Sequence, residues 1–280
     1  MLDKILIAGC GDVGNALATR LLADECEVWG VRRRVDALAN GVRPWRIDLT
    51  DPGSFDAPPA AFDYLFYTAS ADRRDEAHYR SVYVDGLSNL LKALRAAGCP
   101  LRRIFFTSST AVYGQSEGEW VDESSTTEPP GFNGRVLLEA EAIVREAAET
   151  GINVRLSGIY GPGRTRLVRK VRDEEAIATG GWTNRIHVED CAGALHHLMR
   201  LGYPEALYLG TDDEPATTAE VVTWLSAELD APAPPDGPTE RLNKRCRNTR
   251  LRDAGYRFEY PTFREGYRPI VQKFLSQPRD

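Results

Sequence analysis

The chain has 280 residues, of which 42% are hydrophobic and 27% are charged, so it can bury a full core. Its formal net charge of −6 disfavours nucleic acid as a partner, and no apolar run is long enough to span a membrane. The five cysteines contain no C-x-x-C pair, which excludes the usual spacings of a zinc site and of a disulfide framework. The sequence enters its first predicted strand without a signal sequence, so we expect a cytoplasmic protein.

The first predicted element is a short strand that runs into a glycine-rich turn. Residues 4–8 are apolar, and Gly9, Gly11 and Gly14 follow with G-x-G-x-x-G spacing, just before a helix predicted at about 15–23. Strand, glycine turn and helix in this order are typical of dinucleotide binding. Gly9 would permit the tight turn, Gly11 would let the backbone approach a pyrophosphate, and Gly14 would let the helix pack closely on the strand. The free N–H groups at the start of the helix would favour the phosphate charge.

Strands and helices alternate through the first half of the chain. The apolar positions of the longest predicted helix, 75–97, keep helical spacing, and Gly98 ends it. This alternation predicts an α/β fold with a doubly wound parallel sheet. After the first helix, strands are predicted at 26–31, 46–49, 64–68, 103–107 and 151–156, and helices at 75–97 and 136–148.

The second half of the chain has shorter predicted elements. Thr217 with Glu220, and Thr262 with Glu265, have the spacing of a capping box, which predicts that a helix begins at each pair. The charged stretch 164–175 is expected to be a surface helix or loop. Further strands are predicted at 184–188 and 207–209, and further helices at 190–201 and 263–275.

The end of the second predicted strand indicates which nucleotide is preferred. In NAD-binding Rossmann proteins an acid about twenty residues beyond the glycines binds the ribose hydroxyls. Here the strand is followed by Arg32, Arg33 and Arg34, and the first acid is Asp36. Because arginine suits a 2′-phosphate, we expect NADP(H) to be favoured over NAD(H). The alternative is that this basic turn is simply exposed to solvent.

Four stretches resemble the extended short-chain dehydrogenase/reductases, the NAD-dependent epimerase/dehydratase family. The resemblance implies an NAD(P)-binding Rossmann domain with a smaller C-terminal substrate lobe, a small-molecule substrate, and a possible homodimer formed through the helices 75–97 and 136–148. Together with the glycine turn, the four stretches span nearly the whole chain: 106–114, 155–163, 187–190 and 255–267. The implied domains are 1–163 with 184–210 for the cofactor, and 164–183 with 211–280 for the substrate.

The resemblance also implies contacts with the cofactor. The pair Asp48-Leu49 matches the place where the family contacts adenine, and Thr68-Ala69-Ser70 matches the stretch beside the cofactor ribose. The family usually has G-x-x-G-x-x-G, with Ala8 here at the first glycine, so the chain resembles an atypical branch. The predicted cofactor-binding residues are Gly9, Gly11, Asp12, Val13, Gly14, Arg32, Arg33, Asp48, Leu49, Thr68, Ala69 and Ser70.

The catalytic motif of the family is largely replaced in this chain. The family uses a Tyr-x-x-x-Lys pair, in which the lysine lowers the pKa of the tyrosine, and a serine or threonine that binds the substrate oxygen. Ser109 matches the serine, but Arg135 stands in the lysine position and Gly131 in the tyrosine position. The asparagine expected in the long helix falls on Tyr83. Arginine supplies charge but does not shuttle protons, so the usual acid/base pair is missing.

Other residues could take part in the chemistry. Ser109, Arg135 and Tyr113 are the predicted catalytic set, and Tyr160 and His187 are further candidates whose alternative role is packing. We expect an NADP(H)-dependent oxidoreductase or epimerase-like enzyme with a small polar carbonyl or sugar-derived substrate. The alternative is a non-catalytic NADP(H)-binding protein that regulates a partner or acts as a sensor.

Overall fold

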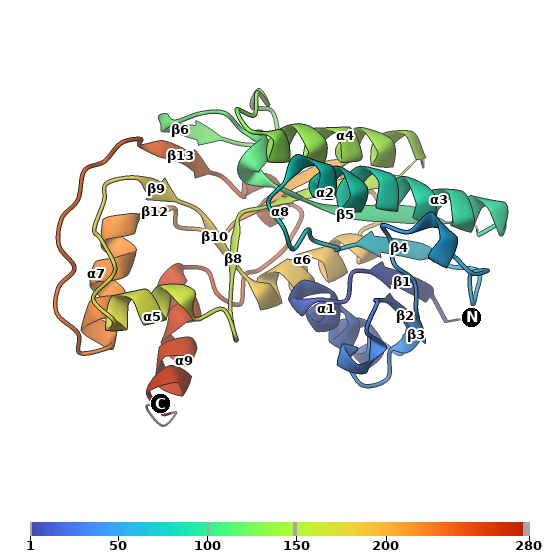
Figure 1. Cartoon of the computed structure of the whole chain (residues 1–280), viewed down its shortest axis with the longest axis horizontal. Coiled ribbons are helices and arrows are strands. Elements are labelled where there is room, and N and C mark those ends of the chain that lie inside the picture. The colour runs from blue at the N-terminus through green and yellow to red at the C-terminus, as the bar shows by residue number, and fades with distance from the viewer. Residues whose placement is uncertain (1, 100, 148–149, 277–280) are drawn as a thin grey trace. The chain divides into compact units, whose positions relative to one another are not determined.

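The fold centres on one sheet of seven strands (Figure 1). The computed structural model describes residues 2–99, 101–147 and 150–276. The strand order is β11-β7-β5-β4-β1-β2-β3, and the pairs from β3 to β5 are parallel. The predicted α/β fold with a parallel, doubly wound sheet is therefore confirmed. The strands are β1 (Lys4–Ala8), β2 (Glu27–Val31), β3 (Arg43–Trp45), β4 (Tyr64–Tyr67), β5 (Arg103–Ser109), β7 (Gly151–Leu156) and β11 (Leu207–Gly210).

Helices cover both faces of this sheet. Figure 1 shows α3 (Gly86–Ala96) and α4 (Phe132–Ala147) on one face, and α1 (Asp12–Ala23) and α6 (Val188–Arg200) on the other. The central strands are apolar along their length because both of their faces are covered; all four residues of β4 are buried. The order of the strands brings the carboxyl ends of β1, β2 and β4 to one edge of the sheet, where the glycine turn lies.

The predicted long helix is continuous but not a single α-helix. It consists of α2 (Glu76–Arg80), a π-helical turn at Ser81–Asp85, and α3. The Tyr67 hydroxyl donates a hydrogen bond to the Val82 carbonyl inside the π-helical turn. A Cβ at Gly86 would lie 2.9 Å from the Tyr67 hydroxyl and 3.0 Å from the Leu49 carbonyl oxygen. The prediction of one regular α-helix is therefore wrong at this turn. The π-helical geometry occurs where Tyr67 of β4 bonds to the helix backbone and where Gly86 packs closely against Tyr67 and Leu49.

Other predicted boundaries also differ from the structure, among them those of the third strand and of the helix α4. The third strand, β3, is Arg43–Trp45, whereas we predicted that the third strand ends with residues 46–49; Ile47 is buried but lies beyond the strand. The helix α4 begins at Phe132, before the predicted start at 136, and the predicted end at Ala148 lies outside the described residues.

The remaining elements form short strand pairs and four helices. The pairs β6–β13 and β8–β10 are parallel, and β9–β12 is antiparallel. Both predicted capping boxes are confirmed, at the starts of α7 and α9, and α5, α7 and α9 share an apolar core. The bounds are β6 (Glu117–Val121), β8 (Gly158–Tyr160), α5 (Arg166–Arg172), β9 (Trp182–Thr183), β10 (Arg185–His187), β12 (Ala216–Thr217), α7 (Thr218–Glu228), β13 (Asn243–Cys246), α8 (Thr249–Asp253) and α9 (Phe263–Leu275).

The chain divides into two compact units whose boundaries differ from the expected domains. The first unit comprises 1–113, 127–155 and 192–208, and the second comprises 114–126, 156–191 and 209–280. The second unit includes the segment of β6 because that strand pairs with β13, and the segment of β8 because that strand pairs with β10. The sequence pattern of β6 and β8 does not reveal these long-range partners.

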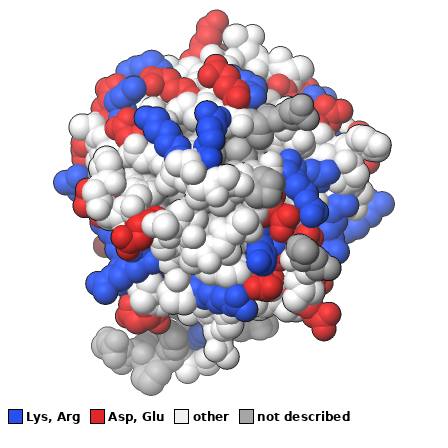
Figure 2. All heavy atoms as spheres, turned by 90° about the vertical axis from the view of Figure 1, so that its right-hand side faces the viewer, with Lys and Arg blue, Asp and Glu red and all other residues white. Residues whose placement is uncertain are grey.

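Charged side chains of both signs occur together on one face of the molecule. On the face presented in Figure 2, basic and acidic side chains are interspersed rather than gathered into areas of one sign. Among the described residues, no helix is both long enough and apolar enough to cross a bilayer.

Candidate nucleotide-binding site

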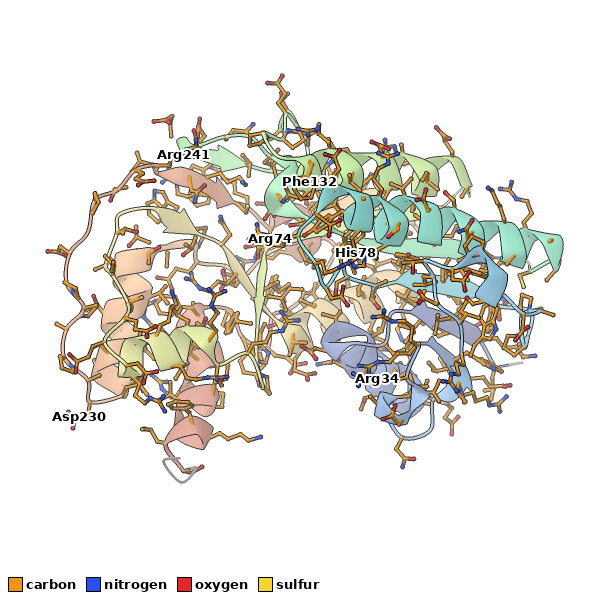
Figure 3. All side chains as sticks on the ribbon, in the orientation of Figure 1. Arg34, Arg74, His78, Phe132, Asp230 and Arg241 are labelled. Carbon is orange, nitrogen blue, oxygen red and sulfur yellow. The ribbon has the colours of Figure 1, made fainter. Side chains whose placement is uncertain are left out.

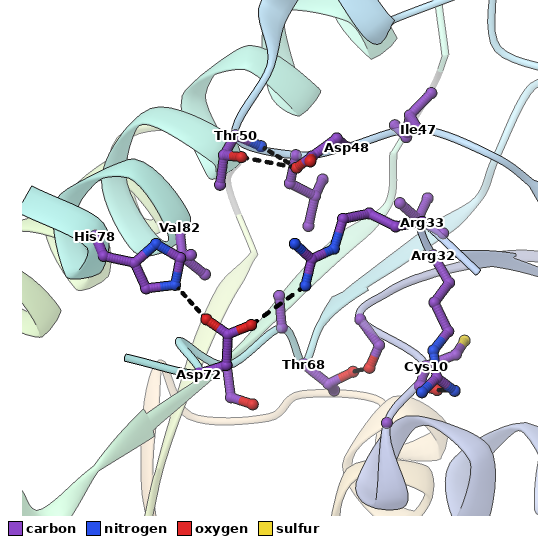
Figure 4. Close-up of a pocket in the computed structure, with 16 residues that line it drawn as sticks. Cys10, Arg32, Arg33, Ile47, Asp48, Thr50, Thr68, Asp72, His78 and Val82 are labelled. Atoms are coloured by element: carbon purple, nitrogen blue, oxygen red, sulfur yellow. Dashed lines mark hydrogen bonds and ion pairs between the residues drawn. The ribbon is translucent and has the colours of Figure 1, made fainter. Parts of the chain in front are cut away.

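A cavity lies in the first unit, at the edge of the sheet where β1, β2 and β4 end. It is lined by the glycine turn, by the ends of these strands, by the segment after β3, and by residues of α2 and the π-helical turn (Figure 4). Of the twelve residues predicted to bind the cofactor, all line the cavity except Asp12, Val13 and Gly14, which begin α1. The sequence therefore located the cavity, although it did not identify every residue that lines it.

The three glycines of the turn have different surroundings. Gly9 has a φ of +101°, and a Cβ there would lie 2.3 Å from Ala69 Cα. A Cβ at Gly14 would lie 2.6 Å from the Gly9 carbonyl oxygen, which also accepts a hydrogen bond of 2.8 Å from the Thr68 hydroxyl. A Cβ at Gly11 would have no atom of the described chain within 4 Å. The fold therefore requires glycine at 9 and 14, whereas a side chain at 11 would meet open space, and Gly11 itself lines the cavity.

Cys10, between these glycines, has the surroundings of a packed side chain. It is fully buried, its thiol lies 3.6 Å from the Ile7 carbonyl oxygen, and burial raises its pKa to about 12. The thiol therefore stays neutral at physiological pH, and it fills space beneath the turn.

The two predicted phosphate-binding arginines have different contacts. One guanidinium nitrogen of Arg32 donates to the Cys10 carbonyl at 2.8 Å and to the Ala37 carbonyl at 3.0 Å. Arg32 therefore ties the glycine turn to the segment that follows β2. The guanidinium of Arg33 instead extends across the cavity and donates to Asp72 at 3.3 Å (Figure 4). Arg33 is the arginine whose charged group faces the space where a ligand would lie.

Asp48, which matches the family's contact with adenine, sits in a small turn. Its carboxylate accepts hydrogen bonds from the Thr50 amide at 3.0 Å and from the Thr50 hydroxyl at 2.7 Å. The Ser54 hydroxyl in turn donates to the Asp48 carbonyl at 2.8 Å. These bonds fix the segment after β3 against the cavity, and they leave the carboxylate with further acceptor capacity.

Sequence reasoning missed Asp72 and His78, which also line the cavity. His78 Nε2 lies 2.7 Å from one oxygen of Asp72, while Arg33 contacts the other oxygen. The hydrogen bond from Arg33, aided by His78, holds the pKa of Asp72 below its usual value. The signal that could have found both residues is their position shortly after β4, since the ends of parallel strands meet at one edge of the sheet.

The residues in the family's catalytic positions lie outside this cavity. The Ser109 hydroxyl accepts a hydrogen bond of 3.2 Å from the Ala111 amide in the short turn that follows β5. Arg135 is exposed in the first turn of α4 and lies 3.5 Å from the Pro130 carbonyl oxygen. Gly131 directly precedes α4, so the structure has no phenol in the position of the family's tyrosine.

Tyr113, the third predicted catalytic residue, belongs to a buried polar cluster. Its side chain is 2% exposed, and its hydroxyl accepts a hydrogen bond of 2.8 Å from Arg155. Arg155 also donates to both carboxylate oxygens of Glu141, at 2.9 and 2.8 Å, and Ser108 donates to Glu141 at 2.7 Å. Glu141 thus links α4 to β5 through Ser108 and to β7 through Arg155, and Tyr113 joins this cluster through Arg155.

An aromatic cluster joins α2, the π-helical turn and the start of α4. Figure 3 labels His78 in α2 and Phe132, the first residue of α4. The ring of Tyr79 stacks edge-on against Phe132, at 5.4 Å between centroids, and lies 5.3 Å from Tyr83. The Tyr83 hydroxyl accepts a hydrogen bond from the Ala71 amide, and burial raises the pKa of Tyr83 to about 12. Tyr83 therefore remains a neutral phenol where the family has asparagine.

Tyr160 and His187 are buried in the second unit. The Tyr160 hydroxyl lies 3.3 Å from the Thr262 carbonyl oxygen, and its ring contacts His187. His187 also packs against Tyr260 with 3.8 Å between ring centroids, and burial lowers the pKa of its imidazole to about 4. These contacts agree with the packing role that was the alternative for both residues.

Comparison with known proteins gives the family. The sequence model described as the NAD dependent epimerase/dehydratase family matches residues 5–210. The chain belongs to that family, so the predicted resemblance is confirmed.

Particular relatives extend the match. A solved structure from Methylobacillus flagellatus, named as a candidate NAD-dependent epimerase/dehydratase, is 37% identical, with a TM-score of 0.86 over 99% of this chain and 100% of that one. Protein YeeZ of Escherichia coli K12 is 31% identical over 209 residues, which are 71% of this chain and 74% of YeeZ. The human epimerase family protein SDR39U1, solved with NADPH, is 21% identical, with a TM-score of 0.77 over 96% of this chain and 99% of that one, and it shares the fold alone.

Proposed function

We propose that the protein is an NADP(H)-dependent oxidoreductase or epimerase-like enzyme that acts on a small polar carbonyl or sugar-derived compound. Membership of the family supports an NAD(P)-linked reaction. The observation that carries the NADP(H) preference is the guanidinium of Arg33, which extends across the cavity at the end of β2. A 2′-phosphate would accept paired hydrogen bonds from this group, whereas the ribose hydroxyls of NADH offer no charge for it.

The residues present fit a dinucleotide. Gly11 leaves open space beside the first turn of α1, whose amides favour a pyrophosphate. Asp48 keeps acceptor capacity for an exocyclic amine such as that of adenine, and Thr68 and Ser70 line the same cavity. When bound, the nicotinamide would supply or accept hydride. In this proposal Ser109 binds the oxygen of the substrate, and Arg135 supplies positive charge.

Titration of the purified protein with NADPH and NADH tests the nucleotide preference. We expect the wild-type protein to bind NADPH more tightly, and Arg33→Ala to raise the NADPH Kd about tenfold while leaving the NADH Kd within about twofold. Arg34→Ala is the matched control, because Arg34 is an exposed neighbour that does not line the cavity. Equal binding of both nucleotides by the wild-type protein would contradict the preference.

The non-catalytic alternative is favoured by one observation, the glycine in the place of the family's tyrosine. In that case the protein binds NADP(H) to regulate a partner. Steady-state oxidation of NADPH with a panel of aldehydes, ketones and sugar-derived carbonyls separates the two proposals. We expect turnover with at least one of them, and loss of most of that turnover in Ser109→Ala with the NADPH Kd unchanged. Tight binding without turnover across the panel would favour the regulatory alternative.

Homodimerisation through the helices 75–97 and 136–148 remains part of the proposal. Sedimentation velocity of the purified protein measures it directly, since a dimer has twice the mass of the 31.1 kDa chain.

A further inference from the structure

Three charged or polar side chains meet over the nucleotide cavity. Arg33 comes from the end of β2, Asp72 from the segment after β4, and His78 from α2 (Figure 4). The Asp72 carboxylate contacts Arg33 through one oxygen at 3.3 Å and His78 through the other at 2.7 Å. The carboxylate therefore bridges Arg33 and His78, which come from elements far apart in the sequence.

We propose that Asp72 is a specificity-determining residue that acts as an internal counter-ion for Arg33 and that the 2′-phosphate of NADP(H) displaces. The inference rests on the proposed NADP(H) function, and it adds a competing group that sets the affinity of the protein for NADP(H). A carboxylate accepts hydrogen bonds from the same donors as a phosphate, so both anions compete for Arg33. The 2′-phosphate carries more charge than the carboxylate, and a ribose hydroxyl carries none. NADPH therefore displaces Asp72, whereas NADH binds with the ion pair intact.

The exposure of the pair makes the exchange easy. The side chains of Arg33 and Asp72 are 65% and 60% exposed, and exposed ion pairs contribute little to stability. His78 is only 12% exposed, and Arg73 lies 3.2 Å from its Nδ1. His78 is thus held in place while Asp72 remains accessible. After displacement, Asp72 keeps His78 as a partner, so the carboxylate is not left without one.

The other charged groups nearby have partners of their own. Asp75 caps α2 by accepting a hydrogen bond of 2.8 Å from the His78 amide, and Arg73 lies 3.9 Å from the Asp75 carboxylate. Asp48 accepts hydrogen bonds from Thr50. Asp72 is therefore the acid that directly neutralises Arg33 among the described residues that line the cavity.

The test compares nucleotides with and without the 2′-phosphate at one fixed ionic strength. Kd values are measured for NADPH, NADH, 2′,5′-ADP and 5′-AMP with the wild-type protein, with Asp72→Asn and with Asp75→Asn. Asp75→Asn is the control. It removes one negative charge from the same segment, and it keeps the N-cap of α2 because asparagine caps a helix as well as aspartate does. We expect Asp72→Asn to tighten NADPH and 2′,5′-ADP binding about two- to fivefold, and the Kd values of NADH and 5′-AMP to stay unchanged.

A second measurement checks that Asp72 acts through Arg33. In an Arg33→Ala background the gain from Asp72→Asn should disappear, since the competition has been removed. A gain of the same size in that background would overturn the counter-ion role, because simple repulsion between Asp72 and the phosphate would then explain it. An effect no larger than that of Asp75→Asn would also overturn it. So would weaker NADH binding by Asp72→Asn, because Asp72 would then be an acceptor for the ribose hydroxyls.

Failure of this inference is distinct from failure of the proposed function. If the wild-type protein binds neither nucleotide, or binds both equally, the NADP(H) proposal fails, and with it the reason for a counter-ion. If the wild-type protein prefers NADPH and Arg33→Ala removes that preference, but Asp72→Asn behaves like its control, only the counter-ion role fails.

Discussion

Gly11 lies between two glycines whose surroundings are already filled by the fold. At Gly9 the backbone has a positive φ and the nearest atoms belong to Ala69; at Gly14 the nearest atom is the Gly9 carbonyl oxygen. At Gly11 a Cβ would project into open space beside the cavity. The same residue type is therefore required for the fold at two positions, and for close approach of a ligand at the third.

This contrast gives a prediction at the scale of single residues. Gly11→Ala should keep the wild-type melting temperature within about 2 °C, but raise the NADPH Kd about tenfold or more, because the methyl group occupies the space of the pyrophosphate. Gly9→Ala should lower the free energy of unfolding by about 2 kcal/mol or more, through its positive φ and the overlap with Ala69. Thermal unfolding and nucleotide titration measure the two effects. If Gly11→Ala binds NADPH as the wild type does, the pyrophosphate lies elsewhere.

Sequence reasoning found most residues of the cavity, but not the network above it. The glycines, Asp48 and the segment after β4 follow from a motif and a family resemblance. Asp72 and His78 belong to no motif, and they meet Arg33 only because β2 and β4 flank β1 in the folded sheet. The sequence also could not separate Arg32 from Arg33, because only the structure shows that Arg32 bonds to backbone carbonyls.

At the scale of elements, the pattern of apolar residues predicted the buried strands correctly. It did not predict elements that lack such a pattern or that depend on contacts with other elements. The strand at 151–156 has the predicted bounds because all of its residues are buried. β3 was misplaced because it contains Arg43 and Pro44 and has no apolar pattern. The π-helical turn was missed because helical spacing does not reveal one extra residue in a turn, and its bond to Tyr67 comes from another element.

His187, the last residue of β10, should make the free energy of unfolding depend on pH. Burial lowers the pKa of His187 to about 4, below its ordinary value of 6.5. Between these two values the unfolded chain binds a proton that the folded protein excludes. The free energy of unfolding should therefore fall as the pH falls from 6.5 towards 4, with a contribution of about 1.4 kcal/mol per pH unit at most.

Urea unfolding at several pH values measures this slope. His187→Phe keeps a ring against Tyr160 and Tyr260 but does not titrate, so its unfolding free energy should fall less steeply over this range than that of the wild type. His197→Asn, on α6, is the control for the loss of a histidine elsewhere in the chain. Equal slopes for His187→Phe and the wild type would show that His187 binds a proton equally in both states.

At the scale of the whole molecule, the two compact units are interleaved in the sequence. Each unit is made of three segments, so the chain passes from one unit to the other five times. The family resemblance implied two segments in each domain, namely 1–163 with 184–210 and 164–183 with 211–280. It could not anticipate that β6 pairs with β13, since neither strand has a pattern that identifies its partner.

The parallel pair β6–β13 has a consequence for synthesis of the protein. Glu117 in β6 pairs with Asn243 in β13, so more than a hundred residues must be translated before β6 meets its partner. At ordinary rates of translation this takes about 6 to 25 seconds. Throughout that time the growing chain presents an unpaired strand edge, with the apolar side chains of Trp120 and Val121, to chaperones and to neighbouring nascent chains.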